Sequence, residues 1–140
     1  MKLISESKES SRLNRSIKKE LLAYKAEDIW KEIPISNDLK VIYRHYIDWT
    51  IKDLRDFSKS LRRQQNTIIL LASTYAGSIR LVCSRSEGLK NVDAGKILTK
   101  ASKLLGGKGG GSSEMAQGGA PLNDSEIINE CLYQSIKDFL

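Results

Sequence analysis

The first part of the chain carries a helical pattern of apolar residues. Residues 5–33 contain neither Pro nor Gly, and Pro34 ends the run, since proline cannot continue a helix. One apolar set recurs at three- and four-residue steps and consists of Leu13, Ile17, Leu21 and Tyr24. A second set, beside Trp30, consists of Leu22, Ala26, Ile29 and Ile33. The pattern predicts one long helix over residues 5–33.

The half of this predicted helix before Leu13 is almost entirely polar, so it has little to bury against its own domain. It is either an exposed helix or an element whose first apolar set packs against a second copy of the chain. We treat residues 1–33 as a helical arm, for dimerisation or as a linker. The expected dimer contacts are Leu13, Ile17, Leu21 and Tyr24. Ser10 and Glu20 interrupt the seam, which argues against a long coiled coil.

After Pro34 the pattern changes to shorter elements. Runs rich in β-branched and aromatic residues predict three strands, over 39–47, 67–74 and 78–84. An apolar residue every three or four positions predicts three helices, over 51–65, 94–105 and 123–140. Thr50 and Asp93 are good N-caps for the first two helices. Because Gly77 separates the second and third strands, these two form a predicted antiparallel hairpin.

The last predicted helix is capped by Asp124 or Ser125, and four residues form its expected apolar face: Ile127, Ile128, Leu132 and Ile136. Together with the strands, the helices predict an α+β (α/β-like) fold. In this fold the long N-terminal helix is followed by a globular domain over residues 34–140, in which helices pack on a small mixed β-sheet.

A glycine-rich stretch over residues 106–121 lies between the last two predicted helices, and seven of its sixteen residues are Gly. We interpret it as a loop, within which a short strand over 115–118 remains open. Glycines let backbone N–H groups gather around an anion, and they let two backbones approach closely. The stretch is therefore expected to bind or to pack, and the sequence leaves open which.

Charge is concentrated in the middle of the chain. The whole chain has a net charge of +6 and a pI of about 9.3. Residues 52–108 hold twelve Lys and Arg against four Asp and Glu, a net charge of +8, whereas residues 109–140 carry a net charge of −4. A basic region beside the glycine-rich stretch is what an RNA-binding surface needs.

Several classes of function are disfavoured. His45 is the only His, so paired-His metal sites are excluded, and it is expected to be a packed or surface residue. Cys83 and Cys131 are expected to be buried thiols, too few for a secreted disulfide scaffold. Lys108 is followed by Gly109 and not by Ser or Thr, which argues against a phosphate-loop NTPase. No apolar run is long enough to span a membrane and no signal core is present, so we expect a cytoplasmic chain.

The glycine-rich stretch also carries a family resemblance. Its pattern Gly-Gly-Lys-Gly-Gly-Gly-x-x-Glu-Met-Ala-Gln-Gly-Gly resembles the C-terminal domain of alanyl-tRNA synthetases, where glycines are followed by Arg or His, Pro, Asp and Met-Ala-Gln. That domain is related to the DHH-associated domain of phosphoesterases, whose motif reads Gly-Gly-Gly-His-x-x-Ala-Ala-Gly. The Met-Ala-Gln core is the specific part, and the resemblance extends over residues 11–140. Ser112, Ser113 and Glu114 replace the usual Arg or His, Pro and Asp.

The resemblance implies a non-catalytic domain, as a fragment or a freestanding relative of a ligase. It implies binding to the tRNA elbow, where the D and T loops meet, with tRNA-Ala as the expected partner, and it implies homodimerisation. The residues expected to contact RNA are Arg80, Lys100, Lys103, Lys108, Gly109, Gly110, Ser112 and Gln117. The related editing domains need a metal-binding set of His and Cys, which this chain lacks. We therefore expect no catalytic site, metal or cofactor here.

Two alternative functions remain. In the first, the chain is a homodimeric protein-interaction module whose long helix is the functional part. In the second, it is the nucleic-acid-binding accessory domain of a DHH-type phosphoesterase. Salt-dependent association with tRNA separates the leading interpretation from the first alternative. Ser112 in place of His, together with the Met-Ala-Gln core, argues against the second.

Overall fold

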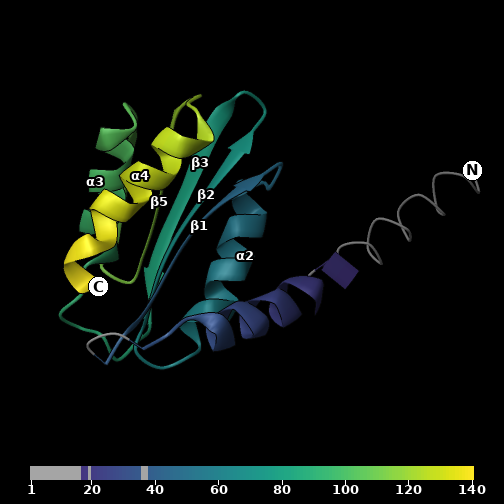
Figure 1. Cartoon of the computed structure of the whole chain (residues 1–140), viewed down its shortest axis with the longest axis vertical. Helices are drawn as coiled ribbons and strands as arrows, with labels where there is room; N and C mark the ends of the chain where they lie inside the picture. The colour runs from purple at the N-terminus through teal and green to yellow at the C-terminus, as the bar shows by residue number, and fades with distance from the viewer. Residues whose placement is uncertain (1–16, 19, 36–37) are drawn as a thin grey trace, which may run out of the picture.

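The computed structural model describes residues 17–18, 20–35 and 38–140. Its centre is a five-stranded sheet in the order β1-β2-β3-β5-β4 (Figure 1). The strands are β1 (Lys40–Ile47), β2 (Thr67–Tyr75), β3 (Ser78–Arg85), β4 (Lys108–Gly111) and β5 (Met115–Pro121). β1 and β2 pair in parallel, and the remaining pairs are antiparallel. The predicted α+β fold with a mixed sheet is confirmed.

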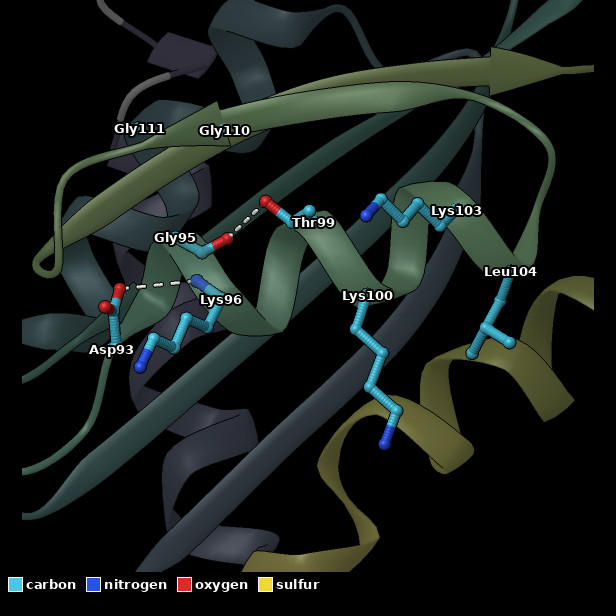
Figure 2. Close-up of a pocket in the computed structure, with 9 residues that line it drawn as sticks. All are labelled: Asp93, Gly95, Lys96, Thr99, Lys100, Lys103, Leu104, Gly110 and Gly111. Carbon is cyan, nitrogen blue, oxygen red and sulfur yellow. Dashed lines mark hydrogen bonds between the residues drawn. The ribbon is translucent and has the colours of Figure 1, made fainter.

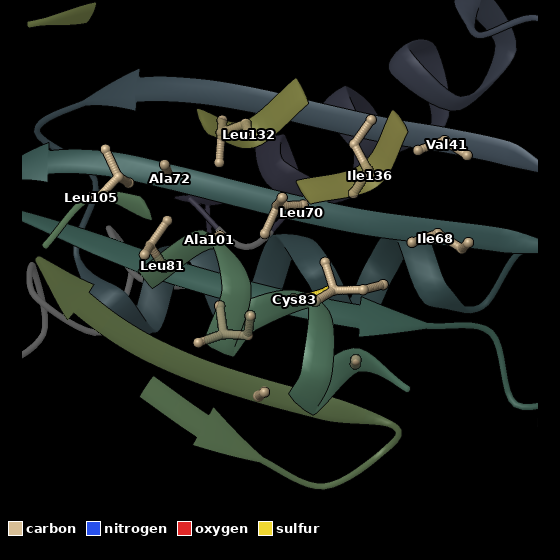
Figure 3. Packing of buried hydrophobic residues seen from close by; sticks show 14 of the residues in the cluster. Val41, Ile68, Leu70, Ala72, Leu81, Cys83, Ala101, Leu105, Leu132 and Ile136 are labelled. Atoms are coloured by element: carbon tan, nitrogen blue, oxygen red, sulfur yellow. The ribbon is translucent and has the colours of Figure 1, made fainter. Parts of the chain in front are cut away.

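Helices cover both faces of the sheet (Figure 1). One face carries α3 (Ala94–Leu104) and α4 (Ser125–Ile136), which runs into the short 3-10 helix η1 (Lys137–Phe139). The other face carries α2 (Ile51–Arg62) and the helical residues 20–32. Apolar side chains from the sheet, α3 and α4 form one buried cluster, part of which Figure 3 shows. A second buried cluster joins the sheet to α2 and the N-terminal helix.

The predicted caps of α2 and α3 are present, whereas Asp124 precedes α4 without a side-chain hydrogen bond to it. The Thr50 side chain accepts a hydrogen bond from the Asp53 N–H, and the Asp53 carboxylate accepts one from the Thr50 N–H, which completes a capping box at the start of α2. α2 ends at Arg62, earlier than predicted, and the chain turns over residues 63–66 before β2, with a φ of 52° at Asn66. Ala76 and Gly77 both have positive φ, as a two-residue hairpin turn requires.

The helix over residues 20–32 packs against the rest of the chain through the second predicted apolar set. Leu22 and Ala26 are buried beside α2. The indole Nε1 of Trp30 donates a hydrogen bond to Thr67 Oγ1 at 3.0 Å, and Lys40 Nζ donates one to the Trp30 carbonyl at 2.8 Å. These contacts fix the helix to the start of the sheet.

The first predicted apolar set faces away from these contacts. The exposed fractions are 46% for Ile17, 56% for Leu21 and 69% for Tyr24. Leu13 lies outside the described residues. An exposed apolar line on a packed helix leaves a surface on which another chain can pack.

Two expectations need correction. The glycine-rich stretch is not a loop: β4 and β5 form a hairpin within it, and β5 lies between β3 and β4. The chain turns at Gly106 and again over 112–114. The short strand considered over 115–118 is confirmed and is longer than expected. Ile127 is 45% exposed and does not join the core. Its neighbour Ile128 does, together with Leu132 and Ile136, because steps of four residues keep side chains on one face of α4.

Among the helices that the structure describes, none has the length and apolar character needed to cross a membrane.

Candidate nucleic-acid interface

A broad groove runs over α3 and is bounded by the edge strand β4 (Figure 2). Its volume is about 640 Å³. It is lined by Asp93, Gly95, Lys96, Thr99, Lys100, Lys103, Leu104, Gly110 and Gly111. Figure 2 shows Lys103 lying along the helix on the strand side, while Lys96 and Lys100 extend away from the strand. Three lysines against one carboxylate make this surface basic.

Glycine brings α3 and the hairpin into contact at backbone distance. A Cβ atom on Gly109 would lie 2.3 Å from Leu98 Cδ1 and 2.7 Å from Ser102 Oγ. A Cβ atom on Gly118 would lie 2.7 Å from the Gly109 Cα. These separations are too short for real side chains, so only glycine lets the helix lie this close to the two strands. The close packing expected of the glycine-rich stretch is therefore present.

The outer edge of β4 carries backbone donors toward the same region. Ser112 N donates to Met115 O at 3.0 Å, which makes this pair a hydrogen-bonded pair of the antiparallel ladder. Because hydrogen-bonded pairs alternate along such a ladder, the N–H groups of Gly109 and Gly111 point away from β5. Lysine ammonium groups and outward backbone N–H groups are both donors to phosphate oxygens.

The tip of the hairpin is held by hydrogen bonds. Ser112 Oγ accepts from Glu114 N at 3.2 Å and from Met115 N at 3.1 Å. Ala94 N donates to Ser113 O at 2.9 Å, which joins the tip to the start of α3. The buried Arg85 guanidinium donates to Val92 O at 2.8 Å and to Ser113 Oγ at 3.4 Å. The strand edge is thus fixed relative to the helix before any ligand binds.

The structure brings together only some of the residues predicted to contact RNA. Lys100, Lys103 and Gly110 line the groove, whereas Gly109 packs under Leu98 and Ser112 is occupied within the hairpin turn. The other three predicted contacts are Arg80, Lys108 and Gln117.

These three side chains lie on the opposite face of the sheet. Lys108 pairs with Gly119 and Gly119 with Arg80, so Lys108 and Arg80 belong to one row across the strands. Gln117 pairs with Val82, which is buried on the α2 face. Since directly paired residues project to the same side of a sheet, the three side chains lie on the α2 face.

The RNA contacts predicted from the sequence omit Lys96 and Thr99. Lys96, Lys100 and Lys103 stand at helical spacing of four and three residues, so one basic stripe was readable from the sequence. Thr99 also lines the groove, and its Oγ1 donates a hydrogen bond to Gly95 O at 2.7 Å. No pattern in the sequence indicated that Thr99 would lie there.

The described residues show no group of three or more His, Cys, Asp or Glu side chains placed to hold a metal ion. Burial lowers the pKa of His45, whose Nε2 lies 2.9 Å from Thr74 Oγ1. Burial, with a smaller contribution from Asp93, raises the pKa of the Cys83 thiol far above its usual value, so this thiol stays protonated and unreactive. The expectation that Cys83 is buried is confirmed, while Cys131 is only partly buried.

Comparisons with known proteins identify the family of this chain. The DHHA1 domain family matches residues 38–138. The alanine–tRNA ligase of Staphylococcus saprophyticus is 32% identical over 137 residues, which cover 96% of this chain and 15% of that protein. The alanine–tRNA ligase of Francisella tularensis subsp. novicida is 32% identical over 140 residues, which cover 99% of this chain and 16% of that protein. The chain thus spans about 15% of the length of these curated relatives.

A solved structure has the same fold. The C-Ala domain of Aquifex aeolicus alanyl-tRNA synthetase superimposes with a TM-score of 0.65 at 24% sequence identity. The match covers 74% of this chain and 96% of that domain.

Proposed function

This chain belongs to the DHHA1 domain family, and on that premise we propose that it is the tRNA-binding and dimerisation domain of an alanyl-tRNA synthetase or of a close relative, acting in the cytoplasm. The observation that carries the proposal is the groove over α3, which is lined by Lys96, Lys100 and Lys103 and bounded by β4. We name this surface the α3 groove.

The chemistry of the α3 groove suits the backbone of a folded RNA. Its lysines and the outward N–H group of Gly111 pair with phosphates, which position a nucleic acid without reading its sequence. The described residues that line it include no aromatic ring and no amide side chain. Such a site selects by shape and phosphate spacing, which fits the corner of a folded tRNA better than a base sequence.

The α3 groove is tested by titrating the chain with tRNA-Ala, an unrelated tRNA and a duplex RNA at two salt concentrations. We expect tighter binding of both tRNAs than of the duplex. We also expect the affinity to fall with salt, with a log–log slope of about −2 to −3 for three phosphate contacts. Equal binding of all three RNAs would leave only a non-specific basic surface, and no binding at moderate salt would reject the proposal.

The dimerisation part of the proposal rests on the exposed set Ile17, Leu21 and Tyr24. Leu22 and Ala26 attach the same helix to the domain, so the exposed set remains available to a second copy. Sedimentation of the chain at tens of micromolar, roughly the range of a weak contact, is expected to show a dimer. Leu21→Glu is expected to shift it to monomer, with Ala23→Glu, at an exposed position on another face of the same helix, as a control. A wild-type chain that stays monomeric would reject this part.

A further inference from the structure

Two hollows flank the loop that joins α2 to β2, and they lie outside the α3 groove. The first, of about 730 Å³, is lined by Lys59, Arg62, Arg63, Gln64, Gln65, Asn66, Ser86, Glu87 and Gly88. The second, of about 450 Å³, is lined by Trp30, Ile35, Asp38, Lys40 and the same four residues, 63–66. The loop over residues 63–66 is therefore a wall common to both hollows.

We propose that these hollows bind unpaired nucleotides of an RNA strand, with base edges at the amide side chains of residues 64–66 and phosphates at Lys59 and Arg63. The inference rests on the proposed RNA-binding function and adds a second site to it. The site differs in kind from the α3 groove, since it offers an aromatic ring and amide side chains as well as cations.

The Trp30 indole is held in place before any ligand arrives. Its Nε1 donates to Thr67 Oγ1, and Lys40 Nζ lies 3.4 Å from the ring centroid. Lys40 Nζ also donates to the Trp30 carbonyl at 2.8 Å, so the ammonium lies over one face of the ring and closes that face to a base. The indole is therefore a fixed wall of the second hollow, and its emission reports what enters that hollow.

Three consecutive amide side chains stand on the loop between the hollows. Gln64, Gln65 and Asn66 each offer donors and an acceptor, the groups that pair with base edges. The loop backbone is fixed, because Asn66 O accepts from Lys40 N at 2.9 Å and Gln64 O accepts from the Ser86 hydroxyl. Amides on a fixed loop, with cations at its side, can hydrogen-bond the edges of unpaired RNA bases while the cations hold the phosphates.

The basic side chains of the site have two different roles: one bonds within the protein, and the others are exposed to a ligand. Arg62 is used internally: its Nε donates to Arg85 O at 3.2 Å and its Nη2 lies 3.5 Å from a Glu114 carboxylate oxygen. Lys59 and Arg63 are exposed at the rim. They are therefore the side chains assigned to phosphates.

The test uses the intrinsic fluorescence of Trp30. The chain has two Trp residues, so Trp49→Phe leaves Trp30 as the sole emitter. This variant is titrated with an unstructured oligouridine of about eight nucleotides, within the usual span of a single-strand site, and separately with uridine monophosphate. We expect saturable quenching by the oligonucleotide and at least tenfold weaker binding of the monophosphate, because one phosphate replaces several.

Two variants with the same charge change distinguish binding at this site from non-specific attraction to the basic chain. Arg63→Glu is expected to weaken oligonucleotide binding about tenfold. Arg55→Glu, an equal charge change at an exposed position two turns earlier on α2, is expected to leave it unchanged. Absence of quenching, or equal losses in both variants, would overturn the inference. Binding of uridine monophosphate as tight as that of the oligonucleotide would also overturn it, since the ligand would then be a free nucleotide.

Failure of this inference is distinguishable from failure of the proposed function. Lys100→Glu/Lys103→Glu is expected to weaken binding of folded tRNA and to leave oligouridine quenching unchanged. If tRNA binds but oligouridine does not quench Trp30, the inference alone fails. If oligouridine quenches but tRNA does not bind, the proposed tRNA-binding function alone fails, and if neither binds both fail.

Discussion

The two faces of the sheet hold their helices in different ways. On the α2 face, large side chains such as Leu54, Phe57 and Leu61 fill the space between helix and strands. On the α3 face, over the hairpin, glycines such as Gly109 and Gly118 remove the side chains, so α3 lies directly on the strands. Large side chains contribute stability through burial on both faces, because the sheet, α3 and α4 also enclose an apolar cluster. What differs is the region over the hairpin, where glycine in place of larger residues sets how closely α3 approaches the strands.

The largest expected effect is on the α2 face. Phe57 is fully buried between Leu54, Leu61 and the aromatic pair Tyr46 and Trp49. Phe57→Ala is expected to lower the free energy of unfolding by about 3–5 kcal/mol, because it leaves a cavity in a packed core. The free energy of unfolding is measured by denaturant titration, with circular dichroism as the signal. A loss below about 1 kcal/mol would mean that α2 is not what stabilises this face.

The next effect sharpens the comparison on the α3 face. Gly118→Ala is expected to cost about 1–3 kcal/mol, because its Cβ atom would press on Gly109 Cα and Lys108 O, which are backbone atoms. Gly110→Ala is the matched control, since nothing lies within 4 Å of its added Cβ atom. Its free energy of unfolding is expected to change by less than about 0.5 kcal/mol. Equal losses in the two variants would show that strand conformation, and not the close approach of β4 and of Ser102 on α3, explains the glycines.

Much of the fold was predictable from local signals. Caps at Thr50 and Asp93 and the turn at Gly77 specify α2, α3 and the first hairpin through interactions between near neighbours. β4 was not predictable, because glycine has little intrinsic preference for strands and the pairing with β5 is imposed by tertiary contact. The exposure of Ile127 likewise depends on which side of α4 meets the sheet.

The candidate site was predictable only in part. Lys100 and Lys103 follow from helical spacing and charge, and Lys96 belongs to the same stripe. Lys108 was grouped with them because it lies within the glycine-rich stretch. Its place on the other face follows from the alternation of side chains along β4, which was not known until the strand itself was known.

A smaller effect concerns the capping box of α2. Thr50→Ala is expected to cost about 1 kcal/mol of unfolding free energy, and Thr50→Ser much less, since serine keeps the hydroxyl acceptor. Thermal unfolding of both variants compares them. Equal destabilisation by Ala and Ser would show that the hydroxyl does not cap the helix.

The same box predicts a dependence on pH. Burial acts to raise the pKa of Asp53, but the hydrogen bonds and charge of Lys18 and the hydrogen bonds from Thr50 outweigh it, so the pKa is lowered. A lowered folded-state pKa adds stability above the unfolded-state value, near pH 4, and this stability is lost as the pH falls through the folded-state value. Asp53→Asn is expected to cost stability at pH 7 and almost none at about pH 2. An equal cost at both pH values would contradict this.

The most direct test of the central claim compares the two faces in tRNA binding. Filter-binding or fluorescence titrations with tRNA-Ala are made on Lys100→Glu/Lys103→Glu, on Lys108→Glu/Arg80→Glu and on the wild type, with unfolding curves to show that each variant folds. The account predicts a loss of at least about tenfold for the α3 pair and a clearly smaller loss for the pair on the α2 face. A larger loss for the Lys108→Glu/Arg80→Glu variant would place the tRNA on the α2 face and contradict the account.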